Sequence, residues 1–175
     1  MPIGAALALG LAGYALQASP EVPGAPAVGT RATGETDWAF VDARKEMVAS
    51  ANRSTSDKMI VADALARQGQ YANAAAMLRA AVKENPRDGE AWLALGNTLV
   101  EHADGALTEP AVLAYRRAAE LDPTGAGPGY FLGFALIRQS RLREARGVWA
   151  ATLETAAPDA AGRAGLEESL KRLDA

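Results

Sequence analysis

The chain has 175 residues, enough for one domain with tails and a sizeable hydrophobic core. Alanine and leucine dominate while aromatic and β-branched residues are sparse, which favours an all-helical fold. The net charge of −3 comes from interspersed acids and bases without a basic stripe, which argues against nucleic acid as a partner. The absence of cysteine excludes a disulfide framework, a thiol redox centre and a cysteine-ligated zinc site.

Residues 1–18 form an apolar segment in which Gln17 is the one strongly polar residue between Ile3 and Ala18. About 20 apolar residues span a bilayer upright, and no basic residue precedes the run as in a signal peptide. We expect a membrane anchor, short or truncated, with a signal-like sequence or a buried helix as the alternatives. Either of the first two places the rest of the chain outside the cytoplasm or at a membrane surface.

Residues 19–36 contain three prolines and three glycines without apolar periodicity, which predicts an exposed linker. A helix is predicted to follow over residues 37–53, with Trp38, Val41 and Met47 on one side. This helix either packs against the rest of the domain or stays mobile.

From about Thr55 the sequence repeats itself in units 55–88, 89–125 and 126–158. The strings AAVKENP and AAELDP close the first two units, and a small residue recurs in the first helix of each unit. This pattern resembles the tetratricopeptide repeat, a helix–turn–helix unit of about 34 residues. The structural positions of the repeat are Trp92, Gly96, Ala111, Tyr115, Pro123, Gly133 and Trp149.

The resemblance implies an all-α tetratricopeptide-repeat superhelix of three helix-turn-helix units plus a C-terminal capping helix over residues 159–175. That last segment has leucines at helical spacing and a charged outer face, as the solvent-facing end of an open stack requires.

The second unit departs from the repeat by about three extra residues in the turn EHADGALTEP. This turn and the motifs after it resemble the soluble repeat domain of bacterial cytochrome c maturation proteins of the CcmH/CcmI and NrfG type. The matching positions are Ala103, Asp104, Gly105, Leu107, Thr108, Pro110, Ala111, Leu121, Asp122, Pro123, Tyr130, Phe131, Leu132, Gly133 and Trp149.

In that family the repeat domain is held to the bacterial inner membrane and faces the periplasm as a haem lyase subunit. The resemblance implies a peptide-binding chaperone that holds the C-terminal helix of apocytochrome c for the haem lyase complex. It also implies the other cytochrome c maturation subunits and the membrane, through the N-terminal segment, as partners. Longer family members have two transmembrane helices, so this chain is either a short member or begins inside its gene.

The glycine-rich stretch TGAGPGYFLG, Thr124 to Gly133, suggests either a phosphate-binding loop or a break between helices. A phosphate-binding loop needs a preceding strand and a following lysine or acidic partner, and the sequence predicts neither. We therefore interpret residues 124–129 as a breaker between the second and third units, and Gly133 as a packing notch.

Stacked repeats line a concave surface with the first helix of each unit, and such a groove suits an amphipathic helix. The register predicts these peptide-binding residues: Met59, Asp63, Leu93, Asn97, Glu101, Tyr130, Phe134, Ile137 and Arg138. Phe134 or Ile137 could instead pack against the capping helix. Asn97 matches the asparagine of known carboxylate clamps, but Met59 stands where their lysine would be, so we expect a helical ligand instead.

No catalytic residue, metal site or cofactor is expected. The single histidine, His102, lacks a second ligand at metal-binding spacing and is interpreted as a surface turn residue. The alternative to a role in cytochrome c maturation is a general repeat scaffold of another cell-envelope complex, for which the fold would be the same.

Overall fold

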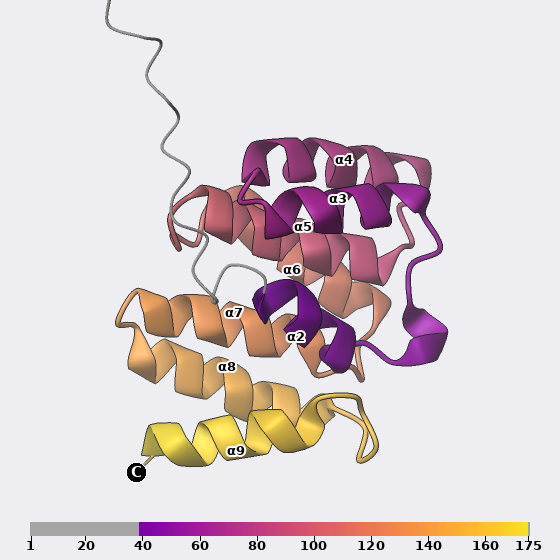
Figure 1. Ribbon diagram of the computed structural model, residues 1–175. Helices are drawn as coiled ribbons and strands as arrows, with labels where there is room; N and C mark the ends of the chain where they lie inside the picture. The colour runs from indigo at the N-terminus through magenta and orange to yellow at the C-terminus, as the bar shows by residue number, and fades with distance from the viewer. Residues whose placement is uncertain (1–38, 175) are drawn as a thin grey trace, which may run out of the picture. The chain divides into compact units, whose positions relative to one another are not determined.

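The computed structural model describes residues 39–174, and every regular element among them is a helix (Figure 1). This confirms the all-α prediction. The predicted anchor over residues 1–18 and the linker over residues 19–36 lie outside the described residues. None of the described helices is both long and apolar enough to cross a membrane.

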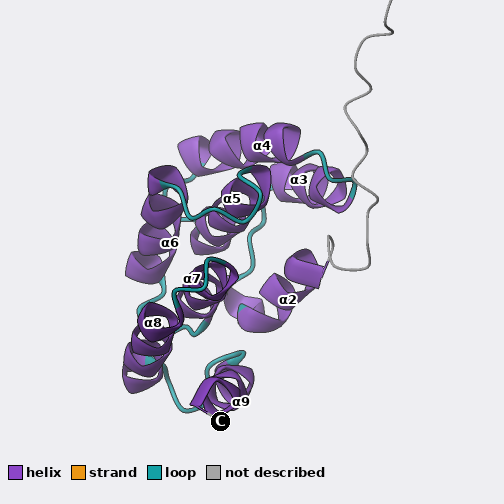
Figure 2. Ribbon diagram, turned by 90° about the vertical axis from the view of Figure 1, so that its left-hand side faces the viewer, coloured by secondary structure: helices purple, strands orange, loops and turns teal. Residues whose placement is uncertain are grey.

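Three helical hairpins follow one another along the chain. The helices are α2 (Ala39–Met47), the 3₁₀ turn η1 (Ser50–Asn52), α3 (Asp57–Arg67), α4 (Tyr71–Glu84), α5 (Gly89–His102), α6 (Glu109–Leu121), α7 (Gly127–Arg138), α8 (Leu142–Thr155) and α9 (Arg163–Asp174). Figure 2 shows α4, α6 and α8 along one side of the stack, with α3, α5 and α7 along the other. The tetratricopeptide-repeat superhelix is therefore confirmed, with α9 packed against the last hairpin.

Within the second and third hairpins a glycine lets the two helices cross closely. A Cβ atom added to Gly96 of α5 would lie 2.7 Å from the Tyr115 ring of α6. Gly133 of α7 lies in the same way against the Trp149 indole of α8, whose Nε1 donates a hydrogen bond to the Tyr130 carbonyl at 3.1 Å. The glycines thus form notches that accept aromatic rings of the second helix.

The long turn of the second hairpin contacts the next unit. Asp104 and Gly105 both have positive φ, 56° and 89°, which turns the chain before Thr108 caps α6. Gly105 lies against the guanidinium of Arg138, where a side chain would clash at 2.6 Å. The extra residues therefore pack on the C-terminal end of α7.

The interpretation of residues 124–129 as a breaker is only partly right. The helix α7 begins at Gly127, so Gly127 and Gly129 belong to its first turn. Both are needed for close packing, because a Cβ atom added to Gly127 would lie 3.1 Å from the Met47 carbonyl and one added to Gly129 would overlap the Thr152 side chain. Thr152 occupies a position that the other units fill with alanine, and Gly129 provides the space for it.

The C-terminal helix α9 covers the exposed end of the last hairpin. Leu166 is fully buried and forms a cluster with Trp149, while Leu170 and Leu173 pack at its margin. Arg163 donates to the carbonyls of Leu153 and Ala156, at 3.0 and 2.7 Å. These bonds satisfy carbonyls at the C-terminal end of α8 that have no partner within the helix.

Two glycines in helix interiors provide a matched test of the notch. Gly133→Ala is expected to destabilise the fold by about 1–3 kcal/mol because the new methyl group overlaps the Trp149 ring. Gly147→Ala in α8 is expected to raise the free energy of unfolding by about 1 kcal/mol, since a Cβ atom added there meets nothing within 4 Å and alanine favours helix. Urea unfolding of both variants measures this difference, and equal effects would contradict the packing role of Gly133.

Candidate functional site

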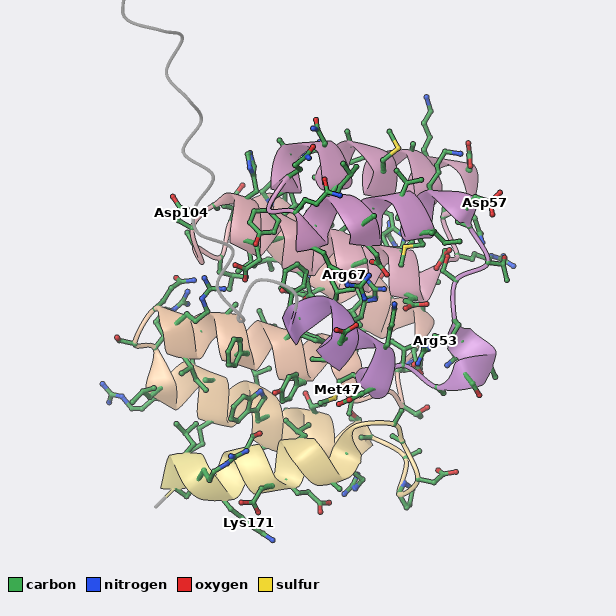
Figure 3. The ribbon with its side chains drawn as sticks, in the orientation of Figure 1. Met47, Arg53, Asp57, Arg67, Asp104 and Lys171 are labelled. Atoms are coloured by element: carbon green, nitrogen blue, oxygen red, sulfur yellow. The ribbon has the colours of Figure 1, made fainter. Side chains whose placement is uncertain are left out.

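The surface formed by α3, α5 and α7 is partly covered by the chain itself. Figure 2 shows α2 lying on this side of the stack, next to α5 and α7. Met47, at the end of α2, packs against Gly127 of α7 and against Gly162 in the turn before α9 (Figure 3). Val41, on the same helix, is fully buried in a cluster with Tyr71. The helix α2 is therefore a packed element of the domain.

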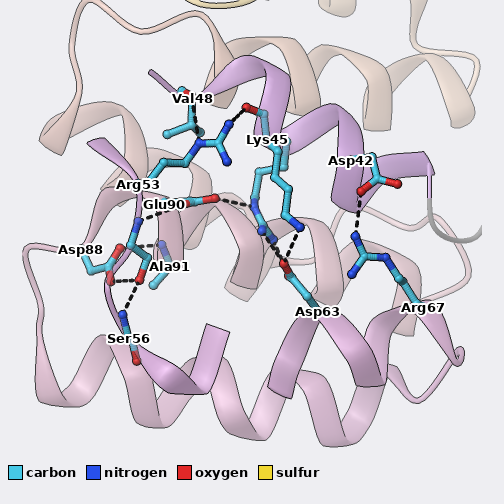
Figure 4. Close-up of polar contacts among 12 residues, drawn as sticks. Asp42, Lys45, Val48, Arg53, Ser56, Asp63, Arg67, Asp88, Glu90 and Ala91 are labelled. Atoms are coloured by element: carbon cyan, nitrogen blue, oxygen red, sulfur yellow. Dashed lines mark hydrogen bonds and ion pairs between the residues drawn. The ribbon is translucent and has the colours of Figure 1, made fainter. Parts of the chain in front are cut away.

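One buried arginine fixes α2 to the first two hairpins. The guanidinium of Arg44 donates to both carboxylate oxygens of Asp63 at 2.8 Å, and to Glu90 Oε1 at 3.0 Å (Figure 4). Arg44 is 2% exposed, Asp63 7% and Glu90 5%, so the three charges form a buried cluster. Because Asp63 lies in α3 and Glu90 in α5, Arg44 joins three helices.

The cluster is electrostatically matched. Burial alone would lower the pKa of Arg44, but hydrogen bonds and the charges of Asp63 and Glu90 outweigh it and raise the pKa above its ordinary value. Arg44 thus stays charged, and Lys45 adds a second cation 3.6 Å from Asp63. The amide of Ser54 donates to the other oxygen of Glu90 at 2.7 Å, so both oxygens of that carboxylate are bonded.

Beyond α2, the concave surface contains an open cavity of about 480 Å³. The wall on one side comes from Phe40 and Ala43 of α2, and the wall on the other from α7. Its floor includes Val100 of α5 and Tyr115 of α6. The lining is mostly apolar, with a few polar groups from α5 and α7.

Aromatic rings of α7 and α8 form a stack at this cavity. The Tyr130 ring is nearly parallel to those of Phe134 and Trp149, with centroids 6.4 and 6.0 Å away. Phe131 meets Tyr130 edge-on at 5.2 Å. Trp149 is buried and Tyr130 half-buried, but Phe134 is 47% exposed, so the stack ends in an apolar ring open to solvent.

Two polar contacts border the cavity. The Tyr115 hydroxyl donates to Asn97 Oδ1 at 3.0 Å, and burial, followed by the charge of Glu101, raises the pKa of Tyr115 above its usual range. Tyr115 therefore remains a protonated donor. Arg138 of α7 forms an ion pair with Glu101 of α5, which joins the second and third hairpins.

The structure divides the predicted peptide-binding residues into two groups. Met59, Asp63 and Leu93 are buried, and Asp63 is bonded to Arg44 of α2, so they are not the open surface that the register predicted. The reason is that α2 occupies their part of the concave side, an outcome that the sequence left open. The predicted residues that do line the open cavity are Asn97, Glu101, Tyr130, Phe134 and Arg138.

Ile137 follows the alternative prediction. It packs at the margin of the cluster formed by Trp149 and Leu166, together with leucines of α9. It does not line the cavity. His102 is exposed, at the end of α5. No three His, Cys, Asp or Glu side chains in residues 39–174 are grouped so that they could hold a metal ion.

Sequence reasoning missed the contribution of α2. Arg44 and Phe40 were not predicted to belong to the site, because their partners lie in other units. The available signal was an arginine three residues after the apolar Val41 and three before Met47, on a predicted amphipathic helix. Two acids, Asp63 and Glu90, at concave positions of the first helices were its potential partners.

Comparison with known proteins agrees with this geometry. A family model described as tetratricopeptide repeat matches residues 58–98, which span α3, α4 and most of α5. The solved structure of the type III secretion translocator chaperone SycD from Yersinia enterocolitica aligns with a TM-score of 0.55 at 17% identity. The alignment covers 71% of this chain and 89% of that one, and it shows similarity of fold alone.

The described chain is therefore a tetratricopeptide-repeat domain. A curated relative, the cytochrome c-type biogenesis protein CycH of Bradyrhizobium diazoefficiens, is 30% identical over 114 residues. The match covers 65% of this chain but 31% of the relative, so the chain spans about a third of that protein's length. The motifs of the second and third units indicate a resemblance to the repeat domain of the cytochrome c biogenesis family. This match confirms that resemblance.

The buried cluster gives a prediction about stability. Arg44→Met is expected to lower the free energy of unfolding by about 3–5 kcal/mol, because it leaves the buried Glu90 carboxylate without a cation and Asp63 with the more distant Lys45 alone. Arg67→Met is the matched control, since Arg67 also joins α3 to α2, through Asp42 at 2.7 Å, but is partly exposed. Its expected effect is within about 1 kcal/mol, and urea unfolding compares the two variants.

The triple variant Arg44→Met, Asp63→Leu, Glu90→Met separates charge from packing. It removes all three buried charges together and is expected to recover most of the stability lost in Arg44→Met. No recovery would show that α2 depends on the shape of the cluster and not on its charge balance.

Proposed function

We propose that this chain is a non-enzymatic scaffold of cytochrome c maturation, which holds the C-terminal region of apocytochrome c for the haem lyase complex. The observation that carries the proposal is the apolar cavity between α2 and α7, with Phe134 half-exposed at its edge. The name of the relative CycH supports a role in cytochrome c biogenesis, and the tetratricopeptide fold supports a role in binding protein segments.

The shape and lining of the site suit one side of an amphipathic helix. Helices that dock in grooves present apolar side chains at positions i, i+3, i+4 and i+7. Phe134 and Tyr130, four residues apart on α7, offer aromatic surface over about one helical turn. Aromatic anchors at the centre of an interface usually contribute most of its binding free energy.

The resemblance to the same family also suggests where the domain lies relative to the membrane and to the other subunits. The repeat domain faces the periplasm, and the N-terminal segment over residues 1–18 holds it to the bacterial inner membrane. The linker over residues 19–36 separates the two. Other subunits of the haem lyase complex contact the domain outside the cavity, so that bound apocytochrome c is presented to them.

Binding of an apocytochrome peptide tests the proposal directly. The full chain is titrated with a peptide that spans the C-terminal helix of an apocytochrome c, with fluorescence anisotropy as the measurement. Saturable binding at micromolar concentration is expected. If the peptide fails to bind and the chain co-purifies from membranes with an unrelated complex, the role is that of a general envelope scaffold.

A pair of substitutions locates the binding surface. Phe134→Ala is expected to weaken binding of this peptide by about tenfold to thirtyfold, because it removes the exposed aromatic anchor. Leu142→Ala is the matched control, since Leu142 is also apolar and 49% exposed but begins α8 and does not line the cavity. Equal losses in the two variants would contradict the proposed surface.

A further inference from the structure

The cavity beside α2 contains a buried hydrogen-bond donor without a partner. Asn97 is 3% exposed and lines the cavity. Its Oδ1 accepts from Tyr115, while its Nδ2 has no hydrogen-bond partner in the described part of the chain. A buried polar group left unpaired destabilises a fold, so such groups in native proteins are usually satisfied by something. An acceptor supplied by a ligand would satisfy this amide.

The orientation of the amide follows from Tyr115. The Tyr115 hydroxyl donates its hydrogen to Asn97 Oδ1 at 3.0 Å, so the oxygen of the amide is already engaged within the domain. The amide nitrogen, with two N–H groups, is then the end left for a ligand. The Asn97 amide nitrogen can therefore donate a hydrogen bond to a ligand, while the amide oxygen already accepts one from Tyr115.

The charges around the cavity are already paired. Among the described residues that line it, Arg138 is the one basic side chain and Glu101 the one acidic side chain, and they form an ion pair. The nearby Arg44 is bonded to Asp63 and Glu90. A carboxylate placed at Asn97 would lose its water without gaining an unpaired cation, which is unfavourable. An uncharged acceptor avoids that cost.

The rest of the lining selects an apolar group. Phe40 and Ala43 of α2 face α7, whose contributions include Phe131, Phe134 and Ala135. The volume of about 480 Å³ lies within the range of about 300–1,000 Å³ typical of ligand pockets. Because Phe40 and Ala43 come from α2, the docked position of α2 closes one side of the pocket.

We propose that this cavity binds one large apolar side chain of the partner together with an uncharged carbonyl beside it, which accepts a hydrogen bond from Asn97 Nδ2. The inference rests on the proposed function in that the concave side binds a protein segment. It adds that α2 forms part of the pocket, and that the bound group is an internal amide carbonyl and not a terminal carboxylate.

Two small probes with the same apolar group distinguish these acceptors. The full chain, labelled with ¹⁵N, is titrated with N-acetylphenylalanine amide and with N-acetylphenylalanine, which carries a carboxylate instead. The amide probe is expected to shift the Asn97 side-chain N–H signals and to bind about tenfold more tightly than the carboxylate. Equal or tighter binding of the carboxylate, or Asn97 signals that do not move at saturation, would overturn the proposal.

Variants test the two parts of the pocket. Asn97→Leu with Tyr115→Phe removes both polar partners together, so that no buried hydroxyl is left unpaired, and is expected to abolish the preference for the amide probe. Phe40→Ala is expected to weaken both probes by at least about threefold, since it opens the wall formed by α2. Leu113→Ala, at an exposed site on α6, serves as the control and should leave both affinities unchanged.

The outcome separates this inference from the proposed function. The probes contain no cytochrome sequence, so a selective pocket can exist even if the apocytochrome peptide does not bind. Conversely, peptide binding that is insensitive to the Asn97 and Phe40 variants would leave the role in cytochrome maturation intact and overturn the pocket. Thermal unfolding followed by circular dichroism verifies that each variant is folded before its affinity is compared.

Discussion

The position of Arg44 determines what the concave side of this domain can do. A buried ion pair adds little net stability compared with apolar packing, but a misplaced member leaves a charge without compensation. Moving α2 by one turn would take the guanidinium away from Asp63 and Glu90, which are buried with it. The cluster therefore disfavours other positions of α2 more than it stabilises the observed one. That position in turn places Phe40 opposite α7.

The docked helix divides a surface that tetratricopeptide repeats usually leave open along its length. The part over α3 is covered, and its buried acid Asp63 is neutralised by Arg44 and Lys45 of the same chain. The part over α5 and α7 keeps an apolar cavity whose charged side chains are paired. A partner thus meets a short, nearly neutral pocket, in which desolvation and fit contribute more to recognition than long-range electrostatic attraction.

The repeats could be predicted from the sequence because their determinants are local and occur more than once. The same contact occurs in successive hairpins, between Gly96 and Tyr115 and between Gly133 and Trp149. Because the spacing recurs, one unit supports the interpretation of the other. The docking of α2 could not be predicted in this way, since Arg44 meets acids 19 and 46 residues away, and no second copy of this contact exists in the pattern. The glycines of residues 124–129 led to a partly wrong prediction of a break between helices. Glycine is common in turns, but it is also the residue that close helix packing requires, as at Gly127 and Gly129.

The fold by itself does not specify a partner. The SycD chaperone shares it at 17% identity, a level at which side chains on the concave side are free to differ. Specificity must then depend on the few groups that the backbone leaves unsatisfied or exposed. At the proposed pocket these groups include the Asn97 amide, which lacks an acceptor within the described residues, and the Phe134 ring, which is half in solvent. One is polar and directional and the other apolar, so a partner must satisfy both at once, and α2 sets the space in which it can do so.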